Sequence, residues 1–71
     1  MKIEVNGAEV EVSDNLTIRQ LLAERRVKMP DMVSVELNGV ILRRAEFETK
    51  VVATGDKVEF LYFMGGGRGS E

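Results

Sequence analysis

The sequence of 71 residues contains no cysteine and no histidine. Without cysteine the chain has no disulfide, no thiolate nucleophile and no cysteine metal site. Without histidine it lacks the side chain that most often acts as a general base near neutral pH and most often binds metals. We therefore predict that the protein is not an enzyme and that it holds no metal and no bound cofactor.

The sequence also lacks a strong excess of either charge and any long hydrophobic run. Its formal net charge at pH 7 is −2, which is too close to balance to indicate binding to nucleic acid or to a membrane surface. No apolar stretch approaches the ~20 residues that span a bilayer, and the first residues do not resemble a signal peptide. The expected location is the cytoplasm. The paired arginines at 25–26 and 43–44 are interpreted as solvated charges.

Alternation of apolar and polar residues indicates two β-hairpins. Apolar and charged residues alternate over residues 2–5 and again over residues 9–12, which is typical of half-buried strands. Asn6 and Gly7 lie between these segments, and this pair favours a two-residue hairpin turn. Alternation returns over residues 33–37, and the apolar residues 40–42 follow a second Asn-Gly pair.

A helix is predicted to begin after Thr17. The Thr17 hydroxyl can accept from the Gln20 amide, while the Gln20 side chain returns to the Thr17 amide. Apolar residues at helical spacing follow, and the segment 27–30, which contains the proline, is expected to end the helix. Arg25 and Arg26 then lie near the helix C-terminus, where positive charge complements the helix dipole.

The order of elements predicts the fold class. Residues 43–49 are expected to form a loop or one helical turn pinned by Phe47, and residues 57–64 the last and most apolar strand. A hairpin, a helix, a second hairpin, a short connection and a final strand indicate an α+β fold. We predict the ubiquitin-like β-grasp: a mixed sheet of about four to five strands packed on one helix, with the first and last strands parallel at its centre. The domain would cover residues 1–64, with a flexible tail over residues 65–71.

Three consecutive glycines, Gly65, Gly66 and Gly67, follow the last predicted strand directly. Glycine continues a strand poorly, because it loses more backbone freedom on ordering than any other residue. It does form a narrow segment without side chains, which the active-site channel of a partner can hold by its backbone. When extended, residues 65–71 reach at most about 23–25 Å. A frayed terminus or the start of a linker is the alternative interpretation.

The last strand also carries a candidate partner-binding surface. We expect Val58 and Phe60 to face the core, which leaves Leu61 and Phe63 on the other face, with Met64 beside the tail. Both Leu61 and Phe63 could instead be buried under neighbouring elements, and a register shift of one residue would exchange the two faces.

Residues 1–67 resemble the ThiS family, the sulfur carriers of thiamine biosynthesis. The features that carry the resemblance are the short opening hairpin, the helix start at residues 17–22, the turn at residues 35–39, Gly55-Asp56 before the last strand, and the finish at residues 63–67. Related carriers serve molybdopterin, cysteine and homocysteine synthesis and share the architecture. The resemblance therefore indicates the mechanism better than the pathway.

The resemblance implies a defined chemistry at the C-terminal glycine. An adenylyltransferase of the E1-like ThiF type would use ATP to adenylate Gly67, or alternatively Gly66, while Gly65 and Gly66 thread into that partner. Sulfur from a donor would displace AMP and leave a thiocarboxylate, which a thiazole synthase or another acceptor enzyme would consume. The rival hypothesis is a β-grasp module that binds protein or RNA, although the acidic balance argues against RNA.

The chain departs from the family pattern at its end. The mature family form ends in Gly-Gly, whereas this sequence continues through residues 68–71. While that extension remains, Gly67 has a peptide bond in place of a carboxylate and cannot be adenylated. We expect a protease to remove the extension after Gly67, or after Gly66, because three glycines leave the register open. An extension introduced by cloning is the alternative.

Overall fold

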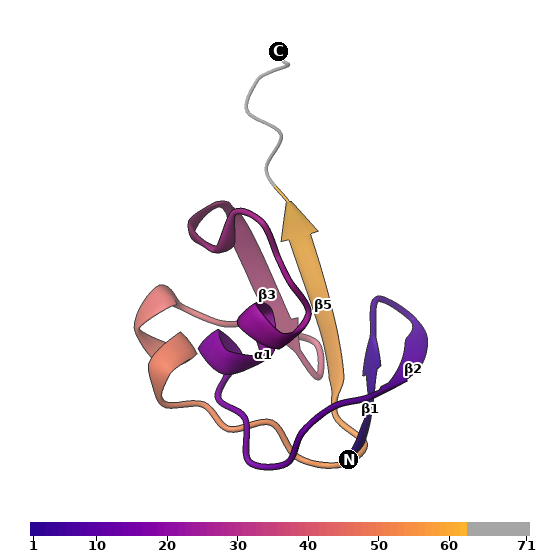
Figure 1. Cartoon of the computed structure of the whole chain (residues 1–71). Helices are drawn as coiled ribbons and strands as arrows, with labels where there is room; N and C mark the ends of the chain where they lie inside the picture. The colour runs from indigo at the N-terminus through magenta and orange to yellow at the C-terminus, as the bar shows by residue number, and fades with distance from the viewer. Residues whose placement is uncertain (63–71) are drawn as a thin grey trace.

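A mixed five-stranded sheet with the helix α1 across one face forms the frame of the molecule (Figure 1). The structure is a computed structural model, and it describes residues 1–62. The predicted α+β fold, a mixed sheet on a helix in the β-grasp arrangement, is confirmed. The elements in chain order are β1 (Lys2–Val5), β2 (Ala8–Glu11), α1 (Ile18–Glu24), the 3₁₀ turn η1 (Pro30–Met32), β3 (Val33–Leu37), β4 (Val40–Ile41), the 3₁₀ turn η2 (Arg44–Glu48) and β5 (Lys57–Tyr62).

The strand order is β2-β1-β5-β3-β4, which places the last strand at the centre. β1 pairs with β5 in parallel, and β3 pairs with β5 in antiparallel orientation. The predicted parallel pairing of the first and last strands is therefore confirmed. The predicted boundary at residue 64 and the tail over residues 65–71 lie outside the described residues.

Both predicted hairpin turns are present. Asn6 and Asn38 have φ 51°, and the glycine after each has φ 85°. Positive φ at both central positions defines the turn whose twist matches that of the flanking strands. The turns fix the strand register, so that Ile3 and Val5 of β1 face the core while Lys2 and Glu4 lie on the other face.

The helix α1 begins as predicted but ends earlier. The Thr17 hydroxyl accepts from the Gln20 N–H at 3.2 Å, and the Gln20 side chain accepts from the Thr17 N–H at 2.9 Å. The helix ends at Glu24 with Arg25 as its C-cap, so the prediction that residues 27–30 end it is wrong. Arg26 adopts φ 58°, outside the helical range. The segment has no glycine or asparagine that would have indicated this conformation from the sequence. No basic residue lies in the last turn of α1.

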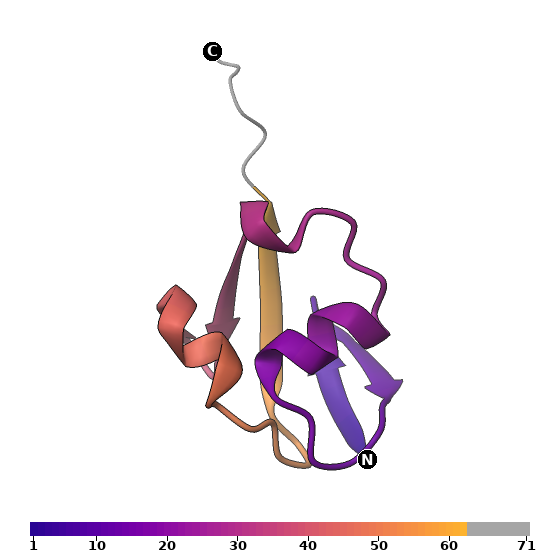
Figure 2. The same ribbon diagram turned by 60° about the vertical axis from the view of Figure 1, so that its left-hand side comes forward.

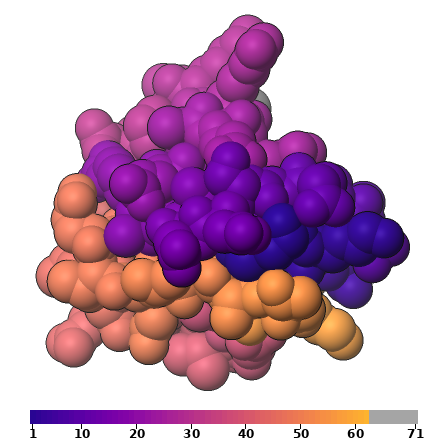
Figure 3. Space-filling view, turned by 60° about the horizontal axis from the view of Figure 1, so that its bottom comes forward, coloured from indigo at the N-terminus to yellow at the C-terminus, as the bar shows by residue number. Residues whose placement is uncertain are grey.

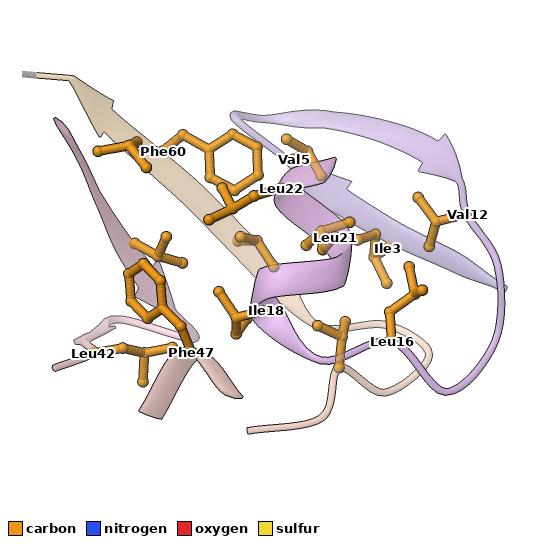
Figure 4. Packing of buried hydrophobic residues seen from close by; sticks show 14 residues of the cluster. Ile3, Val5, Val12, Leu16, Ile18, Leu21, Leu22, Leu42, Phe47 and Phe60 are labelled. Atoms are coloured by element: carbon orange, nitrogen blue, oxygen red, sulfur yellow. The ribbon is translucent and has the colours of Figure 1, made fainter. Parts of the chain in front are cut away.

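The core lies between α1 and the sheet. Figure 4 shows the α1 side chains Ile18, Leu21 and Leu22 pointing toward the strands. Phe47 from η2 is 1% exposed, which confirms the helical turn pinned by this residue. The buried cluster consists of Ile3, Val5, Val12, Leu16, Ile18, Leu21, Leu22, Val33, Val35, Leu42, Phe47, Val52, Val58 and Phe60.

Arg44 links the two 3₁₀ turns. Its guanidinium donates to the carbonyl oxygens of Pro30 at 2.8 Å and Asp31 at 2.6 Å, and it lies over the Phe47 ring at 5.2 Å from the centroid. Arg44 is exposed, which agrees with its interpretation as a solvated charge, but it also makes these contacts between the two turns, which the sequence did not predict. Its partners lie 13 and 14 residues away in the chain, so only the folded structure brings them together.

The N-terminal amine is held at the end of the molecule where β1 begins, opposite to the end of β5 (Figure 1). In Figure 3 the indigo N-terminal segment lies between the purple segment that follows β2 and the orange segment that precedes β5. The amine donates to the Val12 carbonyl at 2.6 Å and pairs with Glu11 at 3.0 Å and Asp14 at 3.2 Å. The hydrogen bonds to Glu11 and then to Asp14 raise the pKa of the amine above its ordinary value. No helix in residues 1–62 has the length and apolar character that crossing a bilayer requires.

Candidate functional site

The site that the structure describes is the end of β5, the segment from which the predicted tail continues. Of the predicted site residues, Leu61 lies within the described part of the chain. Phe63, Met64 and residues 65–67, with the predicted attachment point, lie outside it. Their assigned roles stay predictions.

The two faces of β5 differ as the alternation predicts. Val58 and Phe60 are 1% and 8% exposed, so the prediction that both face the core is confirmed. Leu61 is 43% exposed on the opposite face, which α1 does not cover. The alternative that Leu61 is buried under neighbouring elements is therefore wrong, while its contact with a partner stays a prediction.

Tyr62 departs from the alternation. It shares the core-facing side of β5 with Phe60, yet it is 53% exposed. The reason is the short helix: α1 covers the middle of the sheet, and β5 continues beyond it (Figure 2). Met29, which precedes η1, and Met32, its last residue, are also exposed, and Val33 directly after them pairs with Tyr62 at the end of β5. Sequence reasoning missed this apolar neighbourhood, although two methionines around a proline were a usable signal.

Both hairpin turns hold β5 by its backbone. The Asn6 N–H donates to the Val58 carbonyl and the Asn6 Oδ1 accepts from the Phe60 N–H, each at 2.9 Å. On the other side, the Asn38 N–H donates to the Lys57 carbonyl at 2.8 Å and the Asn38 Oδ1 accepts from the Lys57 N–H at 2.9 Å. The strand that leads into the tail is therefore fixed from two sides by matching contacts.

The face of the sheet away from α1 carries two pairs of opposed carboxylates beside the lysines Lys2 and Lys57. Glu4 lies directly opposite Glu9, and Glu36 lies directly opposite Glu59. Like charges in directly opposed positions repel one another, and within residues 1–62 none of these four carboxylates forms an ion pair. The acidic pairs and Leu61 thus share one open face of the sheet.

The sequence of this protein matches the ThiS family over residues 2–67. The chain belongs to the ThiS family. The match begins at β1, includes every element of the structure and runs to the third glycine, and it confirms the resemblance inferred from the sequence. The extension over residues 68–71 falls outside it.

Solved structures support the ThiS assignment. A crystal structure of the thiamine biosynthesis protein ThiS from Geobacter metallireducens has a TM-score of 0.85 and 45% sequence identity, and it covers 94% of this chain and 100% of that one. A solution structure of a thiamine biosynthesis protein from the same organism has a TM-score of 0.78 and 44% identity, covering 96% and 90% of the two chains. Fold and sequence therefore agree on the family.

A larger relative shares the same segment. A protein named thiazole synthase from Paramagnetospirillum magneticum is 37% identical over 67 residues, which is 94% of this chain but 20% of the relative. The ThiS-family chain therefore spans about one fifth of the length of that relative.

Proposed function

We propose that this ThiS-family chain carries sulfur for thiamine thiazole synthesis as a thiocarboxylate on its C-terminal glycine. The observation that carries the proposal is the extent of the family match, which includes all three glycines and stops at Gly67. A match limited to the packed core would support the fold alone. Its extension through the tail supports the tail as the working part.

The proposed chemistry proceeds in two steps on the carboxyl group. A carboxylate is a poor electrophile, so the adenylating partner joins it to the α-phosphate of ATP and releases pyrophosphate. The resulting acyl-adenylate is then attacked by sulfide, or by a donor that delivers an equivalent sulfur, and AMP leaves. The product is a thiocarboxylate, in which sulfur replaces one of the two oxygens of the carboxylate. We propose that the catalytic groups for both steps belong to the partner, an adenylyltransferase of the ThiF type.

The folded part of the chain acts as a platform in this proposal. β5 is bonded on both sides by the hairpin asparagines, at Lys57 on one side and at Phe60 on the other, and this supports a rigid strand ahead of the proposed tail. Leu61 offers an apolar contact on one face of this strand. A partner that docks there would receive the tail at a constant distance and direction from its own nucleotide site.

The thiazole synthase relative supports the proposed acceptor. In that protein a segment similar to this whole chain is joined to a much longer sequence, and the protein is named thiazole synthase. A carrier-like segment in the same polypeptide supports transfer of sulfur to an enzyme of that kind. We propose that the present chain delivers its sulfur to a separate thiazole synthase.

Removal of residues 68–71 is part of the proposal, since Gly67 has no free carboxyl group while they are attached. The expected mature end is Gly67, with Gly66 as the alternative. The intact mass of the protein isolated from its native host tests this step. Recovery of a sulfur-loaded species that still ends at Glu71 contradicts it.

Loading with sulfur tests the carrier function itself. A chain ending at Gly67 is incubated with the adenylyltransferase of its host, ATP and sulfide, and its intact mass is measured. The expected result is an increase in mass that corresponds to the replacement of one oxygen by sulfur. The chain that ends at Glu71 should show no such increase. Absence of the gain in chains ending at Gly67 and at Gly66 contradicts the carrier function. Transfer to a thiazole synthase, in comparison with synthases of cysteine, homocysteine and molybdopterin, then identifies the pathway.

A further inference from the structure

The strand β5 is longer than its neighbour β1, and one side of its end therefore has no strand beside it. On the β3 side, pairing continues to Tyr62, which lies opposite Val33. On the β1 side, pairing ends where Val5 lies opposite Val58. Figures 1 and 2 both show β5 extending past the β1–β2 hairpin.

The hydrogen bonds of Asn6 show which backbone groups face this side. Asn6 binds the carbonyl of Val58 and the N–H of Phe60, so the backbone groups of both residues are directed toward β1. Backbone groups alternate in direction along a strand, so the N–H of Tyr62 and the carbonyl of Phe60 also point to this side. Val35, opposite Phe60, instead accepts from Leu42 on the β4 side at 2.9 Å, which agrees with this assignment.

The chain supplies no strand for these two groups within residues 1–62. Asn6 is the last residue of the β1–β2 hairpin that bonds to β5, and its Oδ1 already accepts the hydrogen bond from the N–H of Phe60. Protein surfaces usually protect such an edge with charged residues, proline or a covering element. Residues 60–62 are Phe, Leu and Tyr, and Tyr62 is half exposed. The end of β5 is thus an open edge with apolar side chains on both faces.

We infer that the adenylating enzyme places an extended segment of its own beside this open edge and bonds to the N–H of Tyr62 and the carbonyl of Phe60. The inference rests on the proposed function, because it names how the proposed partner is held. Strand addition to a sheet edge is a general mode of recognition in which the main chain supplies affinity and alternate side chains supply specificity. It suits a carrier whose glycine tail has no side chains, because pairing fixes the direction of the chain just before the tail begins.

The side chains around the edge define the occupant. Leu61 and Tyr62 present apolar surface on opposite faces of β5, so the added segment needs apolar residues at two adjacent positions, one for each face. Glu59, two residues before Leu61, lies on the same face of β5 and directly opposite Glu36. A basic residue in the added segment would relieve the repulsion between these two carboxylates.

Amide hydrogen exchange measured by NMR tests the inference directly. The chain ending at Gly67 is compared free and in complex with the adenylyltransferase. The Tyr62 amide is expected to exchange at least ~10-fold more slowly in the complex, the protection that a hydrogen bond in a sheet provides. The Leu61 amide, which faces β3 in the free chain, is the internal control and should be slow in both states. A chain that accepts sulfur while its Tyr62 amide exchanges as fast in the complex as in the free state overturns the inference.

Two variants of Tyr62 separate the main-chain contact from the side chain. Tyr62→Pro removes the N–H, and because no bond within residues 1–62 uses this N–H, the substitution fits an edge position. Tyr62→Ala keeps the N–H and removes only the side chain. We expect Tyr62→Pro to bind the adenylyltransferase about 10-fold more weakly than Tyr62→Ala, as loss of a backbone hydrogen bond predicts. Equal affinities of the two variants, measured on samples whose NMR spectra show the native fold, overturn the inference.

Failure of the inference and failure of the carrier function give different results. When the unsubstituted chain ending at Gly67 gains no sulfur, the carrier function fails and the inference fails with it. When that chain gains sulfur but the Tyr62 amide stays unprotected, only the inference fails. When the Tyr62 amide of the free chain exchanges more slowly as the protein concentration rises, the edge binds a second copy of the chain. This result also overturns the inference.

Discussion

Among single residues, Asn6 combines two requirements that few side chains meet. Its φ of 51° favours Asn or Gly, and its Oδ1 accepts from the N–H of Phe60 at 2.9 Å. Asn6→Gly keeps the turn and loses the acceptor, so we expect it to lower the free energy of unfolding by about 0.5–1.5 kcal/mol. Asn6→Asp, which retains an oxygen at the same place, is the control and should lose less. Urea unfolding of the two variants measures the difference, and a Gly variant as stable as the Asp variant contradicts a stabilising role for this bond.

Also at the residue scale, Glu24 should make stability depend on pH. Its carboxylate accepts from the Ser13 N–H at 2.9 Å, and this hydrogen bond lowers the pKa of Glu24 below its ordinary value of 4.5. A lowered pKa in the folded state adds stability above the ordinary pKa, and this stability is lost as the pH falls through the folded value. Glu24→Gln is therefore expected to be less stable than the native chain at pH 7 and equally stable in strong acid. Unfolding free energies across pH 2–7 test this, and a constant difference contradicts it.

At the scale of elements, the end of α1 carries a local strain. The N–H of Arg26 bonds to the Ala23 carbonyl and the N–H of Val27 to the Leu22 carbonyl, which is the Schellman pattern. This pattern places Arg26 at φ 58°, a conformation that glycine adopts without steric cost. We expect Arg26→Gly to stabilise the chain by about 0.5–1 kcal/mol. Arg25→Gly is the matched control, because φ −82° at Arg25 gains nothing from glycine and the substitution should destabilise. Thermal unfolding that ranks the two variants in the opposite order contradicts this account.

For the whole molecule, local signals predicted more than long-range ones. The Asn-Gly turns and the Thr17–Gln20 capping box are short motifs, and each formed as predicted. The helix end was missed because an arginine in a left-handed conformation leaves no mark in the sequence. The role of Arg44 and the exposure of Tyr62 were missed for a different reason: they depend on where η1 and the end of α1 lie relative to distant strands. In the candidate site, alternation predicted the outward position of Leu61 but could not show that β5 continues past β1.

At the same scale, the proposal separates the molecule into a platform that folds and a tail that reacts. Gly66→Leu changes a residue after the last strand, so we expect an unchanged melting temperature. We also expect sulfur loading to slow by more than ~10-fold, because a side chain would block a partner channel that holds the tail by its backbone alone. Ile3→Val is the opposite control: Ile3 is 2% exposed, and removing one buried methylene costs about 0.5–1.5 kcal/mol. At a temperature where the Ile3→Val chain is still folded, its loading rate should equal that of the native chain. Intact-mass kinetics and calorimetry on the two variants measure both quantities. Equal loading of the Gly66→Leu chain would show that the bare backbone of the tail is not what the partner requires.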